Sequence, residues 1–479
     1  MNIKLILTSL IASVVYSKLP LVSLKIDDRV LDEFNSRLAN PSTELWFNQT
    51  LTHKGGPDSK KYWQQRYFVN DQFYKPGGPA FLFIGGEGEL DARWTEVSIL
   101  AKAAEKHNGI VYALEHRFYG KSYPKPDLST KSLQYLSSEL AVDDLANFAK
   151  TVKLPQSDEP HYDLGKTKWI ISGGSYPGNL AAWTRFKHPE VFHGAVASSA
   201  PVEAKEDFFE YDQQVQRSLE FNGGKDCLNY YIENFKKIDS IMFSRNRKDI
   251  DALKSKFTCE KVSDELFVDA LTYVSGTVQY NNNNKPGNVV DYCKSLKLNG
   301  TASEKLDDFA RDFKKVLNGA TCESFVDLTP FKSEKKGDPT AATRQWLYQC
   351  CTEFGYWQVA PHFGSSATRS RLPRVPFYQD LYCKNLFGPA GPKRPNTYAT
   401  NLKYRSKDIY IKNLLFVNGE LDPWMPLSVS KSYYKSMPSI IVKGASHCSD
   451  ATVPRGIDSK EVAEAKVKVL AFIDELLKN

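Results

Sequence analysis

Cysteine is absent from the first 226 positions of this 479-residue chain, and runs of charge of one sign are short throughout. Lys and Arg total 63 and Asp and Glu total 56, spread evenly, so a nucleic-acid-binding surface is not indicated. After residue 17 no apolar run is long enough to cross a membrane. Hydrophobic residues at 41% and charged residues at 25% are typical of a globular protein and exclude disordered, collagenous and multi-span membrane chains.

Residues 1–17 have the pattern of a secretory signal peptide. Lys4 supplies the positive end, residues 5–15 form a short apolar stretch, and Val15 and Ser17 are the small residues before the cleavage point. The stretch is too short to span a membrane. We therefore expect a soluble mature protein without a membrane anchor, secreted or delivered to the lysosome through the secretory pathway.

The cysteines that are present gather in one part of the chain. Seven of the eight fall between residues 227 and 383, and the last is Cys448. In a protein of the secretory pathway this cluster predicts disulfide bonds within that region. A zinc site would need paired ligands at metal spacing, and only the adjacent Cys350 and Cys351 are close. We expect neither a metal nor another cofactor.

Two sequons are candidate glycosylation sites of a secreted protein. They begin at Asn48 and Asn299 and have threonine at the third position. A third asparagine, Asn40, precedes a proline, which blocks it.

Residues 80–200 alternate short apolar runs with helical patterns, which predicts a parallel sheet covered on both faces. From about residue 203 the chain becomes mostly helical and Lys-rich, and strand patterns return after residue 376. We interpret this as an α/β core in two parts, 18–202 and 376–479, interrupted by a helical lid insertion over 203–375. The expected strands lie at 80–84, 110–115, 169–172, 193–198, 413–417 and 439–443, and the expected helices at 94–107, 140–152, 176–187 and 460–477.

A nucleophile elbow is predicted around Ser175. The segment 169–178 reads as strand, tight turn and helix, which exposes Ser175 at the carboxyl edge of the sheet. Glycines before the serine allow a strained turn, and the helix that begins at Tyr176 points its free N–H groups at the serine. The usual pattern G-x-S-x-G has glycine where this chain has Pro177, and proline is acceptable in the first turn of a helix.

A serine nucleophile needs a base, and the base needs an acid that orients it. In this type of fold the order along the chain is Ser, Asp, His. Asp422 follows one apolar strand run and His447 follows the next, with a gap that suits one helix and one strand. Both residues therefore lie at the sheet edge that carries Ser175. Glu420 is the alternative acid, whereas Asp450 follows His447 too closely to orient it.

The oxyanion of the resulting acyl-transfer reaction needs two backbone donors. One is the N–H of Tyr176, the residue after the nucleophile. The other comes from the glycine-rich loop at 85–88, from Gly86 or Glu87, because glycines permit a close approach of the backbone.

Further segments show a resemblance to one peptidase family. The chain is similar to the lysosomal Pro-Xaa carboxypeptidase family, which also holds dipeptidyl peptidase II and the thymus-specific serine protease, and it looks closest to the thymus-specific branch. The resemblance spans about 85–447. It implies an α/β-hydrolase core, a helical insertion that caps the site, and exopeptidase action beside proline. The matching segments are GGEG at 85–88, EHRFYGKS at 115–122, GGSY at 173–176, WLYQ at 346–349, CTE at 351–353, NGELDPW at 418–424 and GASH at 444–447.

The resemblance also implies which cysteines pair. The residues alone do not fix the connectivity. The family pattern implies the disulfides Cys227–Cys293, Cys259–Cys322 and Cys351–Cys383, and it leaves Cys350 and Cys448 over.

The terminal specificity depends on the groups that bind the ends of the substrate. The dipeptidyl branch has an acidic residue at the second position of the W-x-Y-Q segment, where this chain has Leu347. That difference favours a carboxypeptidase, although Glu353 or Glu87 are alternative partners for a free amine. Arg117 is a candidate for holding a C-terminal carboxylate. Candidates for an apolar pocket that fits proline include Trp357 and Trp424.

The leading hypothesis is a serine-type exopeptidase that works through an acyl-enzyme and removes residues from the C-terminus of short peptides, with proline before the cut. The alternatives are a dipeptidyl peptidase of the same family, a lipase or esterase on the same scaffold, and an inactive binding protein. The polar, cysteine-bearing insertion favours peptides over lipids, and the complete triad argues against an inactive protein. The expected partners are peptide substrates, and a homodimer is a further expectation. Activity should fall at low pH as His447 becomes protonated.

Overall fold

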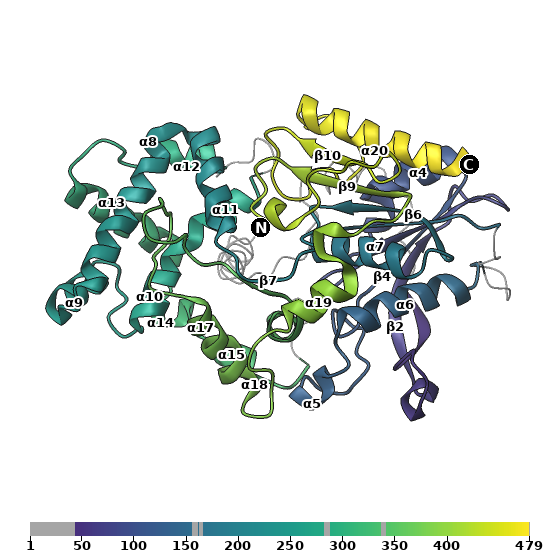
Figure 1. Cartoon of the computed structure of the whole chain (residues 1–479), viewed down its shortest axis with the longest axis horizontal. Helices are drawn as coiled ribbons and strands as arrows, with labels where there is room; N and C mark the ends of the chain where they lie inside the picture. Colours follow the sequence, from purple (N-terminus) through teal and green to yellow (C-terminus); the bar gives the residue numbers. More distant parts are fainter. Residues whose placement is uncertain (1–43, 156–160, 162–165, 282–287, 337–341, 479) are drawn as a thin grey trace, which may run out of the picture.

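The computed structural model describes residues 44–155, 161, 166–281, 288–336 and 342–478. Its centre is an eight-stranded sheet with the order β1-β2-β4-β3-β5-β6-β9-β10 (Figure 1). The strands from β4 to β10 pair in parallel, whereas β1 and β2 extend one edge in antiparallel fashion. This is the α/β-hydrolase fold that the sequence predicted. The strands are β1 (Glu44–Thr50), β2 (Tyr62–Asn70), β3 (Ala80–Ile84), β4 (Ile110–Leu114), β5 (Trp169–Gly174), β6 (Phe192–Ser198), β9 (Leu414–Gly419) and β10 (Ser439–Val442).

The central strands are buried on both sides, which explains their continuous apolar sequences. Every residue of β3, whose sequence is AFLFI, is buried, and the same holds for β4 and β9. Alternate residues of a strand face opposite sides of the sheet. Phe81 and Phe83 accordingly join one apolar cluster, whereas Leu82 and Ile84 join the other. Strands of this kind require helices on both faces.

Helices cover both faces of the sheet, as expected. On the face of Phe81 lie α4 (Ile99–His107) and α20 (Lys460–Lys478). On the opposite face lie α6 (Ser138–Thr151) and α7 (Tyr176–Lys187) (Figure 1). The sheet is therefore the middle layer of three, and its carboxyl edge stays open to loops.

Three parts of the core differ from the sequence-based expectation. The helix expected over 94–107 is interrupted at Ser98, which is extended and forms a β-bridge with Thr452, so that a short α3 (Trp94–Val97) precedes α4. The hairpin of β1 and β2 was not predicted, because its strands are only partly buried and lack a continuous apolar run. Between β9 and β10 the structure has the single 3₁₀ turn η6 (Met425–Leu427) in place of the expected helix.

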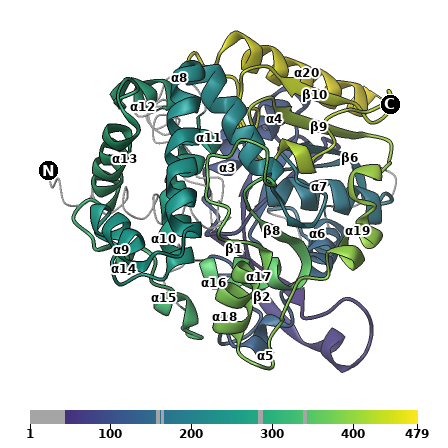
Figure 2. The same cartoon turned by 60° about the vertical axis from the view of Figure 1, so that its left-hand side comes forward.

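Between β6 and β9 the chain leaves the sheet and forms a mainly helical region over residues 199–413 (Figure 2). Its longest helix, α8 (Glu210–Phe243), is kinked at Gly224, whose φ is 78°. Helices α17 to α19 continue beyond residue 375, where the second part of the core was expected to begin. The other described elements of the region are β7 (Lys205–Asp207), α9 (Arg247–Lys256), α10 (Asp264–Ala270), α11 (Val274–Gln279), α12 (Val289–Ser295), α13 (Ala302–Leu317), α14 (Cys322–Phe325), α15 (Thr329–Lys332), α16 (Thr343–Gln349), β8 (Gly355–Trp357), α17 (Val375–Tyr378), α18 (Asn385–Phe387) and α19 (Thr397–Tyr404), with 3₁₀ turns at η2 (Leu271–Tyr273) and η5 (Ser406–Asp408) and π-helical turns at η3 (Cys350–Phe354) and η4 (Gln379–Lys384).

Disulfides staple this helical region. The three pairs implied by the family resemblance are confirmed: Cys227–Cys293, Cys259–Cys322 and Cys351–Cys383. Cys350 and Cys448 are free and buried. The α/β core has Cys448 as its one cysteine, so the three disulfides all lie within the insertion.

Both candidate glycosylation sites lie at the surface. Asn48 on β1 and Asn299 in the loop before α13 are exposed, and their glycosylation stays a prediction. Among the described residues, no helix is both long and apolar enough to cross a membrane. The predicted signal peptide at 1–17 lies outside the described residues.

Candidate active site

Ser175 stands at the sharp turn between β5 and α7. Its backbone has φ 64° and ψ −132°, a combination that residues other than glycine rarely adopt. The N–H of Ser175 donates to the carbonyl oxygen of Ser198 at 2.9 Å, and the N–H of Asn179 donates to the carbonyl oxygen of Ser175 at 3.1 Å. The turn is therefore held on both sides in the strained geometry of a nucleophile elbow.

Glycines allow three backbone segments to meet at this elbow. A Cβ at Gly173 would lie 2.4 Å from the carbonyl oxygen of Pro177, and a Cβ at Gly178 would lie 2.7 Å from the carbonyl oxygen of Ser198. Pro177 lies in the first turn of α7, where its ring is tolerated. The close helix–strand contact is therefore made at Gly178, one residue after the position at which the usual pattern has glycine.

Asp422 and His447 lie side by side at the same edge of the sheet. They follow β9 and β10, which are parallel neighbours, so the loops after these strands emerge together. His447 Nδ1 and Asp422 Oδ2 are 2.9 Å apart, and both residues are buried. The second carboxylate oxygen, Oδ1, accepts the backbone N–H of Trp424 at 2.9 Å. These contacts orient the carboxylate towards the imidazole.

The end of β6 connects the histidine loop to the elbow. Ser198 accepts the N–H of Ser175, and the hydroxyl of the next residue, Ser199, accepts the N–H of Cys448 at 2.9 Å. The elbow therefore contacts Ser198, and the histidine loop contacts Ser198 through Asp450 and Ser199 through Cys448. All three residues of the predicted triad lie in loops at this one edge of the sheet.

The electrostatic surroundings favour the protonated form of His447. Burial by itself lowers the pKa of this imidazole, but Asp422 and Cys448 beside it raise the pKa well above the ordinary value for histidine. A base must be neutral to accept a proton. The pH at which acid switches off this base is therefore higher than for a free histidine.

The helical insertion supports the histidine loop directly. The N–H of His447 donates to the carbonyl oxygen of Gln279 at 3.3 Å, and Ser446 Oγ donates to the carbonyl oxygen of Val278 at 2.8 Å. Gln279 Oε1 also accepts the indole N–H of Trp424 at 3.0 Å. The sequence reasoning missed Gln279, because nothing in its local pattern indicates that the end of α11 reaches the catalytic loops.

The loop after β3 lies against the first turn of α7, as the oxyanion prediction requires. A Cβ at Gly86 would lie 2.9 Å from Cγ of Pro177. This brings the backbone of Gly86 beside the start of α7, where the N–H of Tyr176 is also located. The next residue, Glu87, is only 3% exposed, and burial raises the pKa of its carboxyl to about 8.

Trp424 belongs to an aromatic cluster beside the triad. Its ring centroid lies 5.2 Å from that of Tyr356, 5.5 Å from that of Phe208 and 5.6 Å from that of Tyr211. Trp424 itself is two residues from Asp422 and is 4% exposed. Trp424 thus connects the loop of the predicted acid to aromatic residues of the insertion.

Trp357 and Glu353 lie in packed structure instead. The Trp357 ring is stacked on Tyr378 and Tyr382, with centroids 6.1 and 5.8 Å away. Glu353 accepts the N–H of Ser138 at 2.9 Å and its hydroxyl at 2.6 Å, at the start of α6. These contacts favour structural roles and not the substrate-binding roles considered from the sequence.

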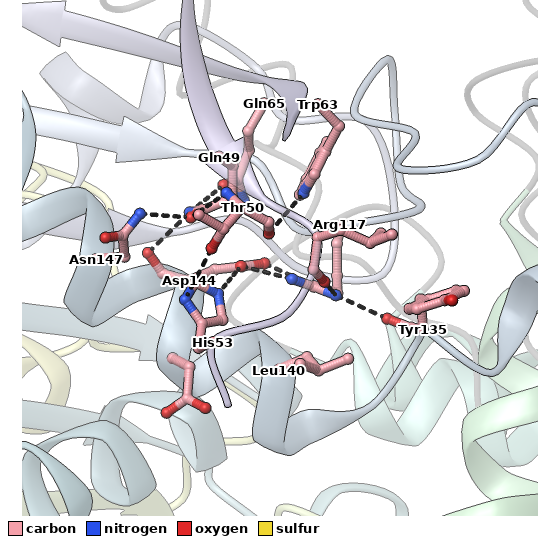
Figure 3. A network of polar contacts seen from close by, with 12 residues as sticks. Gln49, Thr50, His53, Trp63, Gln65, Arg117, Tyr135, Leu140, Asp144 and Asn147 are labelled. Atoms are coloured by element: carbon pink, nitrogen blue, oxygen red, sulfur yellow. Dashed lines mark hydrogen bonds and ion pairs between the residues drawn. The ribbon is translucent and has the colours of Figure 1, made fainter. Parts of the chain in front are cut away.

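Arg117 is fully buried in a polar network between β1, α6 and the loop after β4 (Figure 3). Its Nε and Nη2 each donate to the Asp144 carboxylate at 2.6 Å, and Nη1 donates to the carbonyl oxygens of Leu51 and Tyr135. His53 Nε2 lies 2.7 Å from Asp144 Oδ1. The network engages Arg117 in holding the core together, which favours a structural role over binding of a substrate carboxylate.

The alternative acids have other partners. Glu420 accepts hydrogen bonds from Arg217 at 2.9 Å and from the N–H of Gly444 at 3.0 Å. Asp450 accepts the hydroxyl of Ser198 at 2.5 Å. Asp422 is thus the carboxylate that contacts His447. Within the described part of the chain, no group of three or more His, Cys, Asp or Glu side chains is arranged to hold a metal ion.

An α/β-hydrolase fold with a serine at its elbow defines a serine hydrolase. The sequence profile of the family described as "Serine carboxypeptidase S28" matches residues 55–469, which is most of the chain. The chain belongs to this family and is a serine peptidase. The family resemblance drawn from the motifs is confirmed.

Curated relatives come from distant organisms. The thymus-specific serine protease of Mus musculus is 33% identical over 458 residues, covering 91% of this chain and 87% of the mouse protein. "Probable serine protease EDA2" of Arabidopsis thaliana is 34% identical, covering 90% of this chain and 85% of the plant protein. "Probable extracellular serine carboxypeptidase" of Arthroderma benhamiae is 27% identical, covering 88% of this chain and 65% of the fungal protein.

Proposed function

We propose that this serine peptidase is an exopeptidase that removes residues from the C-terminus of short peptides and prefers proline immediately before the cut. Ser175 is the nucleophile, His447 the general base and Asp422 the acid that orients the base. The observation that carries the proposal is the buried pair of His447 and Asp422, 2.9 Å apart, at the same sheet edge as the strained elbow of Ser175.

The reaction proceeds through an acyl-enzyme. His447 takes the proton of the Ser175 hydroxyl as its oxygen attacks the scissile carbonyl, and Asp422 stabilises the resulting imidazolium. The tetrahedral oxyanion accepts hydrogen bonds from the N–H of Tyr176 and from the loop at Gly86 and Glu87. The imidazolium then gives its proton to the leaving amine, and water releases the acyl group by the same steps.

The C-terminal direction has two supports. The matched family is described as serine carboxypeptidases, and one relative carries that activity in its name. Leu347 is fully buried in α16 at the position where the dipeptidyl branch has an acidic residue. An apolar side chain offers nothing to a free amine, so this position does not support dipeptidyl peptidase action.

The preference for proline rests on the aromatic cluster around Trp424. Its rings come from the loop of Asp422 and from the insertion that packs on this loop, and burial holds them in a fixed arrangement. The rigid pyrrolidine ring of proline suits apolar surroundings of this kind and loses little conformational freedom on binding.

We also place the protein in the secretory pathway, either secreted or lysosomal, acting on peptides that it meets there. The disulfides of the insertion support this location, because such bonds persist in oxidising compartments. The extracellular designation of the fungal relative agrees with it.

A peptide library with free or blocked ends tests the proposal. Amidation of the C-terminus should suppress cleavage, acetylation of the N-terminus should not, and mass spectrometry identifies the products. The reverse result would indicate a dipeptidyl peptidase, and indifference to both modifications an endopeptidase. Nitrophenyl esters and triglycerides as parallel substrates test the lipase or esterase alternative.

A further inference from the structure

Glu87 differs from most buried carboxyl groups. It is 3% exposed, and within the described residues its Oε2 has no hydrogen-bond partner. Buried carboxyl groups are normally paired with a cation or satisfied by donors, because an unsatisfied polar group in the interior costs free energy. A protein that keeps such a group unsatisfied beside its active site has a reason to do so, and a ligand that completes the hydrogen bonding is the simplest one.

The groups around Glu87 favour its neutral form. Among the described titratable side chains whose charges interact with that of Glu87, only His447 can carry a positive charge. Burial is the main cause of the raised pKa of about 8, and His447 lowers that pKa only in part. Below this pH the side chain is a carboxylic acid with one O–H donor. The described titratable groups whose charges interact with that of Glu87 are the phenols of Tyr119, Tyr176 and Tyr280, the thiol of Cys350 and the imidazole of His447.

We propose that Glu87, as a neutral carboxylic acid, donates a hydrogen bond to the C-terminal carboxylate of the peptide substrate. This inference rests on the proposed carboxypeptidase function and assigns the group that recognises the end of the chain. Arg117, the cation considered for that task from the sequence, is engaged by Asp144 and two backbone carbonyls.

The position of Glu87 relative to His447 suits the leaving group. In a carboxypeptidase the leaving amine belongs to the terminal residue, and it receives its proton from the histidine. The carboxylate of that residue is two bonds from this nitrogen, so the group that binds it must lie near the histidine. Glu87 directly follows Gly86, whose backbone lies against Pro177 in the first turn of α7, at the sheet edge that also carries the loop of His447.

The free amine of a dipeptidyl peptidase substrate lies on the other side of the cut, one residue further into the acyl part. Binding an ammonium ion requires the ionised carboxylate, whereas binding a carboxylate requires the acid. The two roles therefore predict opposite dependence on pH. Among the described groups whose charges interact with that of Glu87, His447 is the only one that can be a cation, and the others are phenols and a thiol. These surroundings favour the protonated acid, which is the form that binds a carboxylate.

The proposed role of Glu87 predicts a specific dependence of kcat/KM on pH. Hydrolysis of peptides with a free C-terminus should lose about tenfold in kcat/KM per pH unit above about pH 8, as Glu87 ionises and repels the substrate carboxylate. The loss should appear mainly in KM. The acid limb of the same profile belongs to His447, which must be neutral.

The test compares the wild-type enzyme with Glu87→Gln and Glu87→Ala on an N-acetylated peptide ending in Pro-Phe, with pH varied from about 5 to about 9.5. The Gln side chain keeps an N–H donor and cannot ionise, so Glu87→Gln should retain activity and lose the alkaline limb. Glu87→Ala should raise KM by about tenfold or more at neutral pH. Asp450→Asn, which changes another buried carboxyl near His447, should keep the alkaline limb.

Labelling of Ser175 by a fluorophosphonate in each variant shows that the variants are folded and that the nucleophile is intact. An alkaline limb that survives in Glu87→Gln would overturn the assignment of Glu87 while leaving the carboxypeptidase proposal in place. Loss of cleavage by Glu87→Gln only for peptides with a free amine would assign the ionised role and overturn the proposal. A wild-type enzyme that is labelled but ignores free C-termini would overturn both.

Discussion

Asp144 and Glu87 are two buried carboxyl groups of the core whose pKa values are shifted in opposite directions. Burial alone would raise the pKa of Asp144, but Arg117 and His53 bring it below its usual value. Glu87 has no such partners, and burial raises the pKa of its carboxyl to about 8. Burial does not distinguish these two sites; the neighbours do.

Asp144 is a carboxylate that stabilises the fold, whereas we propose that Glu87 is a carboxyl group that binds substrate. Around Asp144, hydrogen bonds from Arg117 and a contact with His53 tie α6 to the hairpin and to the loop after β4 (Figure 3). In Glu87, by contrast, one carboxyl oxygen has no donor within the described structure. The first arrangement stabilises the fold, and the second reserves binding capacity at a cost in stability.

The largest expected effect comes from removing the nucleophile, which should abolish turnover and leave the fold intact. Ser175→Ala should lower kcat by about 10⁶-fold, because the nucleophile is lost and only substrate binding and the oxyanion donors remain. Its melting temperature should stay close to that of the wild type, since the hydroxyl contributes little to the core. Steady-state kinetics and thermal unfolding check both parts, and more than trace turnover in the purified variant would refute the elbow assignment.

The next largest effect is a loss of stability of the folded protein. Asp144→Ala leaves the Arg117 guanidinium buried without its carboxylate, and we expect a loss of about 3–5 kcal/mol in the free energy of unfolding. Denaturant unfolding gives the value. The double variant Arg117→Met with Asp144→Ala should recover part of the loss, because no unpaired charge remains. Simple additivity of the two single changes would argue against a coupled pair.

The third prediction concerns the pH dependence of stability. The native state keeps the proton of Glu87 up to about pH 8, whereas the unfolded chain releases it near the ordinary value of 4.5, so the native state binds more protons between these limits. Wild-type stability should therefore fall by about 1.4 kcal/mol per pH unit across that window relative to Glu87→Gln. Thermal unfolding of both proteins at several pH values measures the slope, and parallel curves would contradict the raised pKa.

The smallest effect is expected at the rim of the Asp144 network. His53→Ala removes one contact to Asp144 and should cost about 1 kcal/mol in the free energy of unfolding. His188→Ala is the matched control, because His188 also contacts an aspartate, Asp143, at a more exposed position. Surface pairs contribute less, so the control should cost no more than about 0.5 kcal/mol. Equal losses would show that the network adds nothing beyond a single contact.

The sequence was sufficient for those features that depend on local pattern. Continuous apolar runs predicted strands such as β3 and β9, and the glycines before Ser175 predicted a turn that the structure confirms at φ 64°. The order of Ser175, Asp422 and His447 predicted their common sheet edge. Each of these signals lies within a few consecutive residues.

The features that the sequence did not reveal depend on contacts between distant parts of the chain. From the sequence, Arg117 and Glu353 were both candidates for binding substrate. In the structure the packing of α6 pairs Arg117 with Asp144 and Glu353 with Ser138. The support of His447 by Gln279 joins two segments whose local patterns give no sign of each other. Such partners are set by tertiary packing, which no local periodicity encodes.

The contact between Gln279 and the histidine loop has a consequence for biosynthesis. The nucleophile Ser175 is translated first, the supporting carbonyl of Gln279 follows, and His447 emerges last. A growing chain on the ribosome thus carries the serine of the predicted triad without its base. The predicted triad can therefore assemble only when most of the chain has been synthesised.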